Sequence, residues 1–333
     1  MSTQPNPDEG KLITVLGPVE PDAMGITLPH EHLLIRHTPP EVMLTDPDLA
    51  AEELGAFARA GGTTLIDVTS KGIGRDPESL RHISQQTGVH IVMAASYYKK
   101  AWHPPEMDRL SAEEIEEEIV SDVLDGVGDT GIRAGDTRIR AGVIGEVGVT
   151  DSLTGNERKA VIASARAQHR TGAAMNFHIH LLDKPAEEDL RMRALDLVES
   201  EGADPNRVVM SHFEPADESL DYHERIARRG AYIEYDLFGM AARSGTDIPD
   251  YRMESRFLRK LIDRGLLDRI LISQDICYRQ LLVANGGWGY AHILEHVVPR
   301  FLANGIADSE IEAVMVTNPR RVFPLSQQEA PDG

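Results

Sequence analysis

The chain has 333 residues, 41% of them hydrophobic, and it carries 54 acidic against 34 basic side chains, for a formal net charge of -20. This charge argues against a nucleic-acid-binding protein, which needs a basic face for phosphates, and against a polybasic membrane-surface protein. One cysteine, Cys277, excludes an internal disulfide and a multi-cysteine zinc site, and without a secretory signal or an apolar run of roughly 18 residues we expect a soluble cytoplasmic protein.

Residues 11–24 are predicted to form a small β-hairpin that precedes the main fold. Short apolar segments rich in β-branched residues follow and are predicted to be strands: 26–35, 63–69, 90–98, 141–149, 173–180, 207–214, 231–238 and 269–275. Helical patterns lie between them, at 49–60, 111–124, 156–170, 186–199, 219–229 and 253–264. Ser111 followed by Glu114 has the spacing of a capping box, which marks the start of one helix.

Strands that alternate with helices of this length are typical of βαβ units and a parallel sheet. Eight such units predict an α/β fold that closes into a (β/α)8 barrel, or TIM barrel, because an open doubly wound sheet usually has fewer strands. No linker or low-complexity stretch interrupts the pattern. We therefore expect a single domain over residues 11–325, with flexible ends at 1–10 and 326–333.

The C-terminal ends of the strands carry the chemistry in barrels of this class. Imidazoles and carboxylates gather at these ends: His30, His32, Glu146, His178, His212 and Asp275. Each alone has an ordinary structural explanation, such as a helix cap for Asp275, but their common position is hard to obtain by chance. Carboxylates and imidazoles are costly to bury together unless divalent cations compensate them, so the sequence predicts a metal site at the barrel mouth.

The chain also resembles a known family, the phosphotriesterase-related proteins of the amidohydrolase superfamily, over residues 12–325. The resemblance rests on motifs that occur in the family's order: Gly17-Pro18, the LPHEH run at 28–32, GIGRDP at 72–77, Tyr97-Tyr98, GEVG at 145–148, VMSH at 209–212, SQDIC at 273–277, GGWGYAHIL at 286–294 and NPRR at 318–321.

The resemblance implies a centre with two divalent metal ions, for which zinc is expected and manganese or cobalt would also suit the ligands. By the family pattern, His30, His32 and Asp275 hold the more buried ion, His178 and His212 hold the more exposed ion, and Glu146 bridges both. Organophosphate-degrading enzymes and quorum-quenching lactonases carry a carboxylated lysine at the bridging position. Glutamate there places this chain in another branch of the family and makes proficient phosphotriester hydrolysis less expected.

The implied activity is metal-dependent hydrolysis, in which a bridging hydroxide attacks the carbonyl of a lactone, a carboxylic ester or an N-acyl amide. Asp275 is the expected catalytic residue, acting first as general base and then as general acid. Two alternatives remain open at this point: a phosphotriester or organophosphate hydrolase, and a zinc-binding protein without catalytic activity. The complete ligand set argues against the last of these.

Expected substrate contacts come from residues near the strand ends, namely Tyr98, Arg279 and His180, with Lys99 and Arg243 as helpers by loop position. Arg279 could hold a carboxylate or phosphate through its guanidinium fork, although a solvated loop arginine is the favoured explanation. Tyr98 could instead pack at the rim, and His180 could be an exposed polar residue. The substrate is expected to be a small molecule, and the resemblance allows a homodimer.

Overall fold

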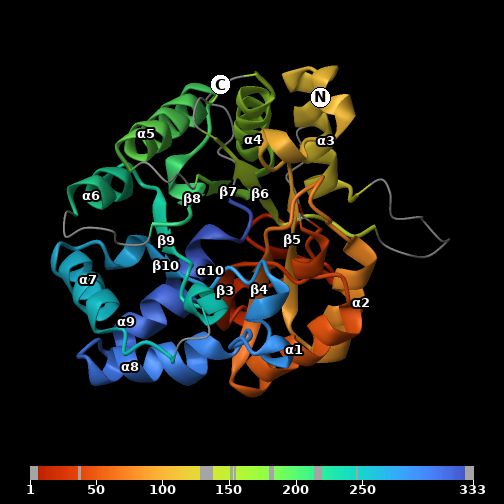
Figure 1. Cartoon of the computed structure of the whole chain (residues 1–333). Helices are drawn as coiled ribbons and strands as arrows, with labels where there is room; N and C mark the ends of the chain where they lie inside the picture. Colours follow the sequence, from red (N-terminus) through yellow and green to blue (C-terminus); the bar gives the residue numbers. More distant parts are fainter. Residues whose placement is uncertain are drawn as a thin grey trace.

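Eight parallel strands form a sheet that curves round into a barrel, with helices outside it (Figure 1). The computed structural model describes residues 7–36, 39–127, 138–150, 153, 155–179, 184–213, 220–244 and 247–326, without the side chains of 184–189 and 243–244. The barrel strands are β3 (Ile26–Glu31), β4 (Gly62–Asp67), β5 (His90–Ala95), β6 (Val143–Gly148), β7 (Ala174–His178), β8 (Val208–Met210), β9 (Tyr232–Tyr235) and β10 (Ile270–Ile272). They lie in chain order, so the predicted (β/α)8 barrel is confirmed.

Side-chain hydrogen bonds join the first strand of the barrel to the end of the last. The backbone N–H of His30 donates to Ser273 Oγ at 3.1 Å, and Ser273 Oγ donates to the carbonyl oxygen of His30 at 2.9 Å. Ser273 Oγ also lies 2.6 Å from Glu31 Oε1. A serine and a buried glutamate thus connect β3 to the segment that follows β10, where the sheet closes.

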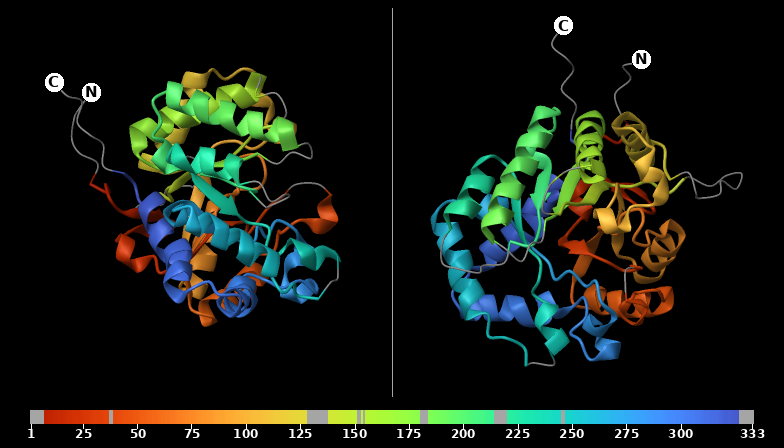
Figure 2. Two further views of the ribbon diagram at one scale, coloured as in Figure 1. Left: turned by 90° about the vertical axis from the view of Figure 1, so that its left-hand side faces the viewer. Right: turned by 45° about the horizontal axis from the view of Figure 1, so that its top comes forward.

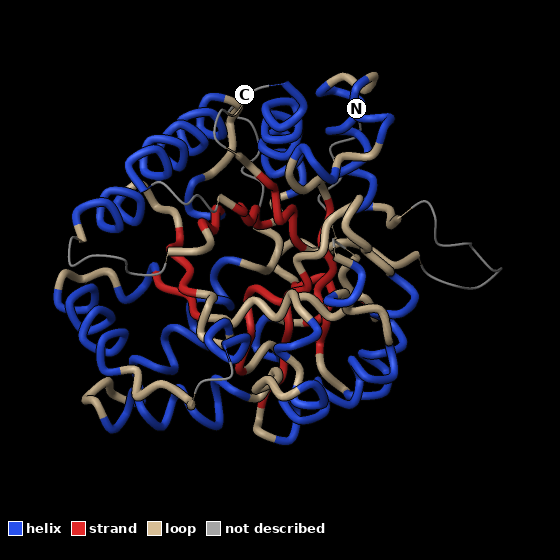
Figure 3. Tube along the Cα trace, viewed as in Figure 1, coloured by secondary structure: helices blue, strands red, loops and turns tan. Residues whose placement is uncertain are grey.

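Helices surround the strands on the outside, as the tube view shows (Figure 3). The described helices are α1 (Pro47–Arg59), α2 (Pro77–Thr87), α3 (Ala112–Leu124), α4 (Gly155–Thr171), α5 (Lys184–Ser200), α6 (Asp221–Arg228), α7 (Arg252–Asp263), α8 (Val298–Ala303), α9 (Asp308–Glu312) and α10 (Asn318–Val322). No described helix is both long and apolar enough to cross a membrane.

Local sequence signals set where these helices begin. Asp46 accepts hydrogen bonds from the first N–H groups of α1, and Pro47 occupies its first turn. At α3 the capping box is present, with Ser111 Oγ accepting from the N–H of Glu114 at 3.2 Å and Glu114 Oε2 accepting from the N–H of Ser111 at 2.8 Å. The apolar residues Ile115 and Ile119 of α3 face the core.

The predicted hairpin is confirmed as β1 (Leu12–Thr14) and β2 (Gly17–Val19), which pair antiparallel. Leu12 packs with apolar side chains from several barrel strands. The beginning and the end of the described chain lie side by side (Figure 2), where the N–H of Gly10 donates to the carbonyl of Leu325 and that of Ser326 to the carbonyl of Gly172. The other residues that we expected to be flexible, 1–6 and 327–333, lie outside the described residues.

Candidate metal centre

The predicted ligands come together at one end of the barrel because each stands at or just beyond the C-terminal end of a strand. His30 and Glu146 lie within β3 and β6, and His178 is the last residue of β7. Three others follow their strands: His32 after β3, His212 after β8 and Asp275 after β10. All six are buried, with exposed fractions between 0% for His30 and 9% for His178.

One group of donors consists of His30, His32 and Asp275, whose ligand atoms all lie within 4.8 Å of one another. His32 Nε2 is 3.3 Å from Asp275 Oδ1, and His30 Nε2 is 3.9 Å from the same oxygen. Two imidazoles and a carboxylate at this spacing could hold one divalent cation.

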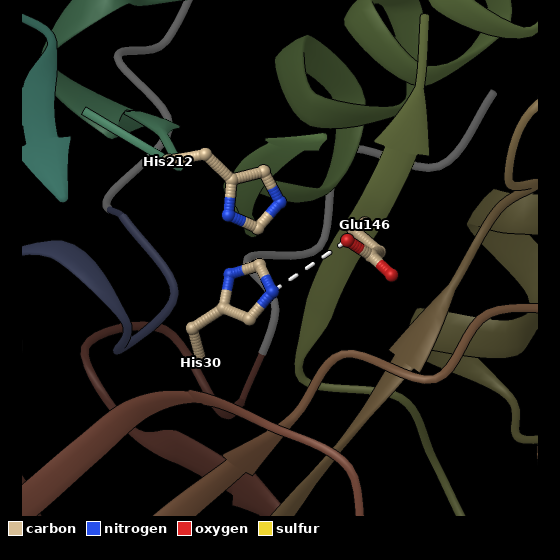
Figure 4. Close-up of side chains that lie close together, drawn as sticks. All are labelled: His30, Glu146 and His212. Atoms are coloured by element: carbon tan, nitrogen blue, oxygen red, sulfur yellow. Dashed lines mark ion pairs between the residues drawn. The ribbon is translucent and has the colours of Figure 1, made fainter. Parts of the chain in front are cut away.

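Glu146 lies between this group and the other two histidines. Its Oε1 is 3.5 Å from His32 Nε2, while its Oε2 is 3.5 Å from His30 Nε2 and 2.8 Å from His178 Nδ1. His212 Nε2 in turn is 2.8 Å from His178 Nδ1. Figure 4 shows Glu146 beside the rings of His30 and His212, with the ion pair to His30 dashed. Glu146 therefore contacts imidazoles of both groups, His30 and His32 on one side and His178 on the other.

Two observations show that the cluster fits a cation. Among the described residues, His30 Nε2 and Asp275 Oδ1 are buried without a hydrogen-bond partner, although both point at the other ligands. Burial alone would lower the pKa of His30 and of His32, yet neighbouring carboxylates, above all Asp236 for His30 and Asp275 for His32, raise both pKa values. The cluster thus attracts positive charge to the nitrogens that would ligate a metal.

Residues behind the ligands fix the orientation of the rings. His30 Nδ1 lies 3.0 Å from Glu234 Oε2 and 3.0 Å from Ser211 Oγ. His212 Nδ1 lies 2.8 Å from Asp236 Oδ1, and His32 Nδ1 lies 2.9 Å from Thr69 Oγ1. With Nδ1 bonded on the outside, each Nε2 faces the centre, which is the usual arrangement of metal-binding histidines.

Glu234 and Asp236 also belong to the site, although they were not predicted from the sequence. A signal was present, because residues two apart at the end of a strand point to the same face, and acidic side chains at 234 and 236 interrupt the apolar segment 231–238. Their burial at 0% exposure completes a shell of carboxylates around His30 and His212.

The ring of His178 has the opposite orientation to the rings of the other three histidines. Its Nδ1 faces Glu146 and His212, whereas its Nε2 faces the pocket, 3.1 Å from Tyr98 Oη and 3.0 Å from Lys99 Nζ. Burial lowers the pKa of His178 to about 3, so its imidazole is neutral at pH 7 and has a lone pair for a ligand.

Asp275 is positioned by the loop after β10. Its φ of 46° lies in the left-handed region, which a non-glycine residue adopts only when its surroundings hold it there. Glu31 supplies that support, because its carboxylate accepts hydrogen bonds from the backbone N–H groups of Gln274 at 3.0 Å and Ile276 at 2.9 Å. Burial opposes ionisation of Asp275, but the imidazole of His32, whose Nε2 lies 3.3 Å from Asp275 Oδ1, and the charge of His30 hold its pKa well below the usual range.

A pocket of about 330 Å³ opens over these ligands. Besides metal-ligand candidates it is lined by Ile35, Tyr98, Lys99, Trp102, Leu237, Met240, Cys277 and Tyr278. Tyr98, an expected substrate contact, lines this pocket, and so does Lys99. Burial lowers the pKa of Lys99, which the carboxylates of Glu146 and Asp275 oppose.

Arg279, another expected substrate contact, is not brought to this pocket. Arg279 is exposed and lines a separate cavity of about 150 Å³ that also contains Met43, Asp46 and Leu282. Its Nε donates to Asn285 Oδ1 at 3.4 Å. Although Arg279 is only four residues beyond Asp275, the chain turns into a short 3₁₀ helix, Arg279–Leu281, which carries the guanidinium away. His180 and the side chain of Arg243 lie outside the described residues.

Comparisons with known proteins agree with this geometry. The model of the phosphotriesterase family matches residues 10–323. An N-acetyltaurine hydrolase from Danio rerio is 34% identical, over 94% of this chain and 97% of its own length. Among solved structures, a resiniferatoxin-binding protein from Rhodobacter sphaeroides has a TM-score of 0.86 at 36% identity, covering 98% of this chain and all of its own.

A mutant of a phosphotriesterase-like lactonase from Deinococcus radiodurans has a TM-score of 0.75 at 28% identity, over 94% of this chain and 99% of its own. The family match spans nearly the whole sequence, and the relatives match over nearly their entire length. The resemblance seen in the sequence motifs is thereby confirmed, and the chain is a hydrolase that belongs to the phosphotriesterase family.

Proposed function

We propose that this hydrolase cleaves the amide bond of an N-acyl amino acid or amino sulfonic acid with the help of two divalent cations, zinc being the metal that its ligands suit best. The observation that carries the proposal is the convergence of four imidazoles and two carboxylates under one pocket, with buried ligand atoms that lack other partners. Curated relatives at 34% identity are N-acetyltaurine hydrolases, which makes N-acetyltaurine the first substrate to test.

His30, His32 and Asp275 would hold one cation, His178 and His212 the other, and Glu146 would contact both. Cations bound in this way lower the pKa of water to near neutrality and act as Lewis acids toward a carbonyl oxygen. Glutamate at position 146 already carries its charge and needs no carboxylation by carbon dioxide to serve as a bridge.

Asp275 then has the role of moving one proton. Its pKa is held low, so its carboxylate is ionised at neutral pH and accepts a proton from the attacking water. As the oxygen of water bonds to the carbonyl carbon and the C–N bond breaks, Asp275 returns the proton to the leaving nitrogen. The products are an amine and a carboxylic acid, which releases its proton to solvent and becomes a carboxylate, and Asp275 regains its original state.

A lactone is the second candidate substrate, because the lactonase from Deinococcus radiodurans matches over 94% of this chain. Opening a lactone needs the same attack on a carbonyl carbon, with an alkoxide in place of the amine as leaving group. Which of the two substrates is preferred depends on the side chains that line the pocket and not on the residues that would hold the metal ions.

The test is metal analysis combined with a substrate panel. We expect about two metal ions per chain after loading with zinc, and hydrolysis of N-acetyltaurine or a related N-acyl amine to exceed that of lactones, aryl esters and a phosphotriester. Asp275→Asn should lower kcat by at least about 100-fold on the best substrate. Asp268→Asn, at an exposed aspartate just before β10, is the matched control and should keep the wild-type rate.

Metal content is measured on the same samples, because Asp275 is also a ligand. An Asp275→Asn protein that retains both ions and the wild-type kcat would contradict the role in proton transfer. A wild-type protein that binds no divalent cation would contradict the proposed function as a whole.

A further inference from the structure

Lys99 provides the cationic side chain of the metal pocket. Of the described residues that line this pocket, it alone is a lysine or arginine. The side chain is half-buried, and its Nζ lies 4.7 Å from the centre of the Tyr98 ring and 3.0 Å from His178 Nε2. Its ammonium group therefore points into the same space as the nitrogen of a metal-ligand candidate.

Lys99 has no acidic partner in the part of the chain that the structure describes, where no carboxylate oxygen lies within 4 Å of its Nζ. The buried guanidinium of Arg75, by contrast, is paired with Asp122 at 2.6 Å. A half-buried ammonium without a carboxylate in direct contact is costly, and an anion in the pocket would reduce that cost.

The hydrogen bond from Lys99 to His178 depends on which nitrogen of the ring carries the proton. His178 Nδ1 is 2.8 Å from both Glu146 Oε2 and His212 Nε2, so it is the nitrogen on the side of the ligands. If Nδ1 holds a cation, the proton of the neutral ring must be on Nε2, which then donates and no longer accepts. An ammonium group cannot accept this hydrogen bond, whereas the hydroxyl of Tyr98 at 3.1 Å can.

We propose that Lys99 is a specificity-determining residue, which binds the acidic group of the substrate, a carboxylate or a sulfonate, at the rim of the metal pocket. This inference rests on the proposed function and defines its substrate class as N-acyl amines with an acidic group. The apolar side chains of Ile35, Trp102, Leu237 and Met240 line the same pocket and would contact the uncharged part of the molecule. A local cation is needed for such a substrate because the protein as a whole carries a charge of -20.

The experiment compares Lys99→Met, which keeps the length of the side chain, with Lys99→Arg, which keeps its charge. Lys100→Met is the matched control, since this neighbouring lysine is exposed and does not line the pocket. All proteins are loaded with zinc and their metal content is measured. Binding of 1-propanesulfonate is followed by calorimetry, and kcat and KM are determined for N-acetyltaurine and for the neutral ester phenyl acetate.

Lys99→Met should weaken propanesulfonate binding and raise KM for N-acetyltaurine by about 10- to 100-fold, the range for a lost hydrogen bond to a charged group. Its kcat should stay within about threefold, and its KM for phenyl acetate and its metal content should be unchanged. Lys99→Arg should retain most of the binding, and Lys100→Met all of it.

Equal losses on the charged and the neutral substrate, or a loss of metal, would instead show that Lys99 supports His178, and would overturn the inference. Failure of the wild type to bind propanesulfonate would overturn it as well. If the wild type hydrolyses none of the substrates, the proposed function fails, while the binding data still decide whether Lys99 holds an anion.

Discussion

At the scale of single residues, the centre depends on side chains that do not ligate. Asp236 contacts both His212 Nδ1 at 2.8 Å and His30 Nδ1 at 3.4 Å, so one carboxylate orients two rings. A carboxylate behind an imidazole fixes the tautomer and makes the opposite nitrogen a better ligand.

Asp236→Asn should therefore weaken zinc binding by about 10- to 100-fold, measured by competition with a chromogenic chelator. Asp122→Asn is the matched control, because Asp122 is also a buried aspartate, but it pairs with Arg75 outside the centre. We expect this control to lower the free energy of unfolding and to leave the zinc affinity at the wild-type value. Equal zinc affinities in the two variants would show that Asp236 does not orient the ligands.

The positions of the ligands could be predicted from the sequence because strand ends in a closed barrel share one rim. The direction of each ring could not, since it depends on contacts such as that between His32 and Thr69, which are 37 residues apart. The same limit applies to Arg279, which is close to Asp275 along the chain but lines a different cavity.

At the scale of elements, strand existence was predictable and strand length was not. The segment 207–214 contains β8, but the strand itself covers only Val208–Met210, because ladder pairing ends where the chain turns toward the centre at His212, whose φ is 59°. Helix α2 was not predicted, since its sequence is largely polar and buries few apolar residues, among them Leu80 and Ile83. Its boundary signals were nevertheless present: Asp76 caps the start and Gly88 follows the end with a φ of 73°.

Capping gives an element-scale prediction. Ser111→Ala removes the acceptor for the N–H of Glu114 and should lower the free energy of unfolding by about 1 kcal/mol in urea titrations. Ser200→Ala replaces an exposed serine at the last residue of α5, where only a solvent-exposed hydrogen bond to the carbonyl of Leu197 is lost, and should change stability by less than about 0.5 kcal/mol. A Ser111→Ala protein as stable as the wild type would mean that the packing of α3 on α4 makes the cap redundant.

At the scale of the whole molecule, burial makes stability depend on pH through groups far from the chemistry. His292 is fully buried, its Nε2 is 2.7 Å from Tyr251 Oη, and no described residue forms a hydrogen bond with its Nδ1. Burial, with the nearby charges of His296 and Arg300, lowers the pKa of His292 to about 3. The folded protein therefore holds this ring neutral, whereas the unfolded chain protonates it below about pH 6.5.

Because the pKa of His292 is lower in the folded protein than in the unfolded chain, acid destabilises the fold. The contribution of His292 to the free energy of unfolding is complete above about pH 6.5 and is lost as the pH falls toward 3. By pH 5 the loss amounts to about 2 kcal/mol, from 1.36 kcal/mol per pH unit. Between pH 7 and pH 5, the free energy of unfolding measured in urea should fall by about 2 kcal/mol less for His292→Gln than for the wild type. His82→Gln, at a half-exposed ring, should follow the wild type. Parallel pH profiles for His292→Gln and the wild type would contradict the assignment.

On the ribosome, β3 emerges long before the segment that it must join, because His30 and Ser273 are 243 residues apart. Until that segment leaves the exit tunnel, the edge of β3 opposite β4 has no neighbour, and Glu31 has none of the three donors that satisfy it later. Asp275 arrives with the same segment, so the nascent chain cannot complete its first group of ligands before the barrel itself can close. Completion of the candidate metal site and closure of the barrel therefore depend on the same few residues.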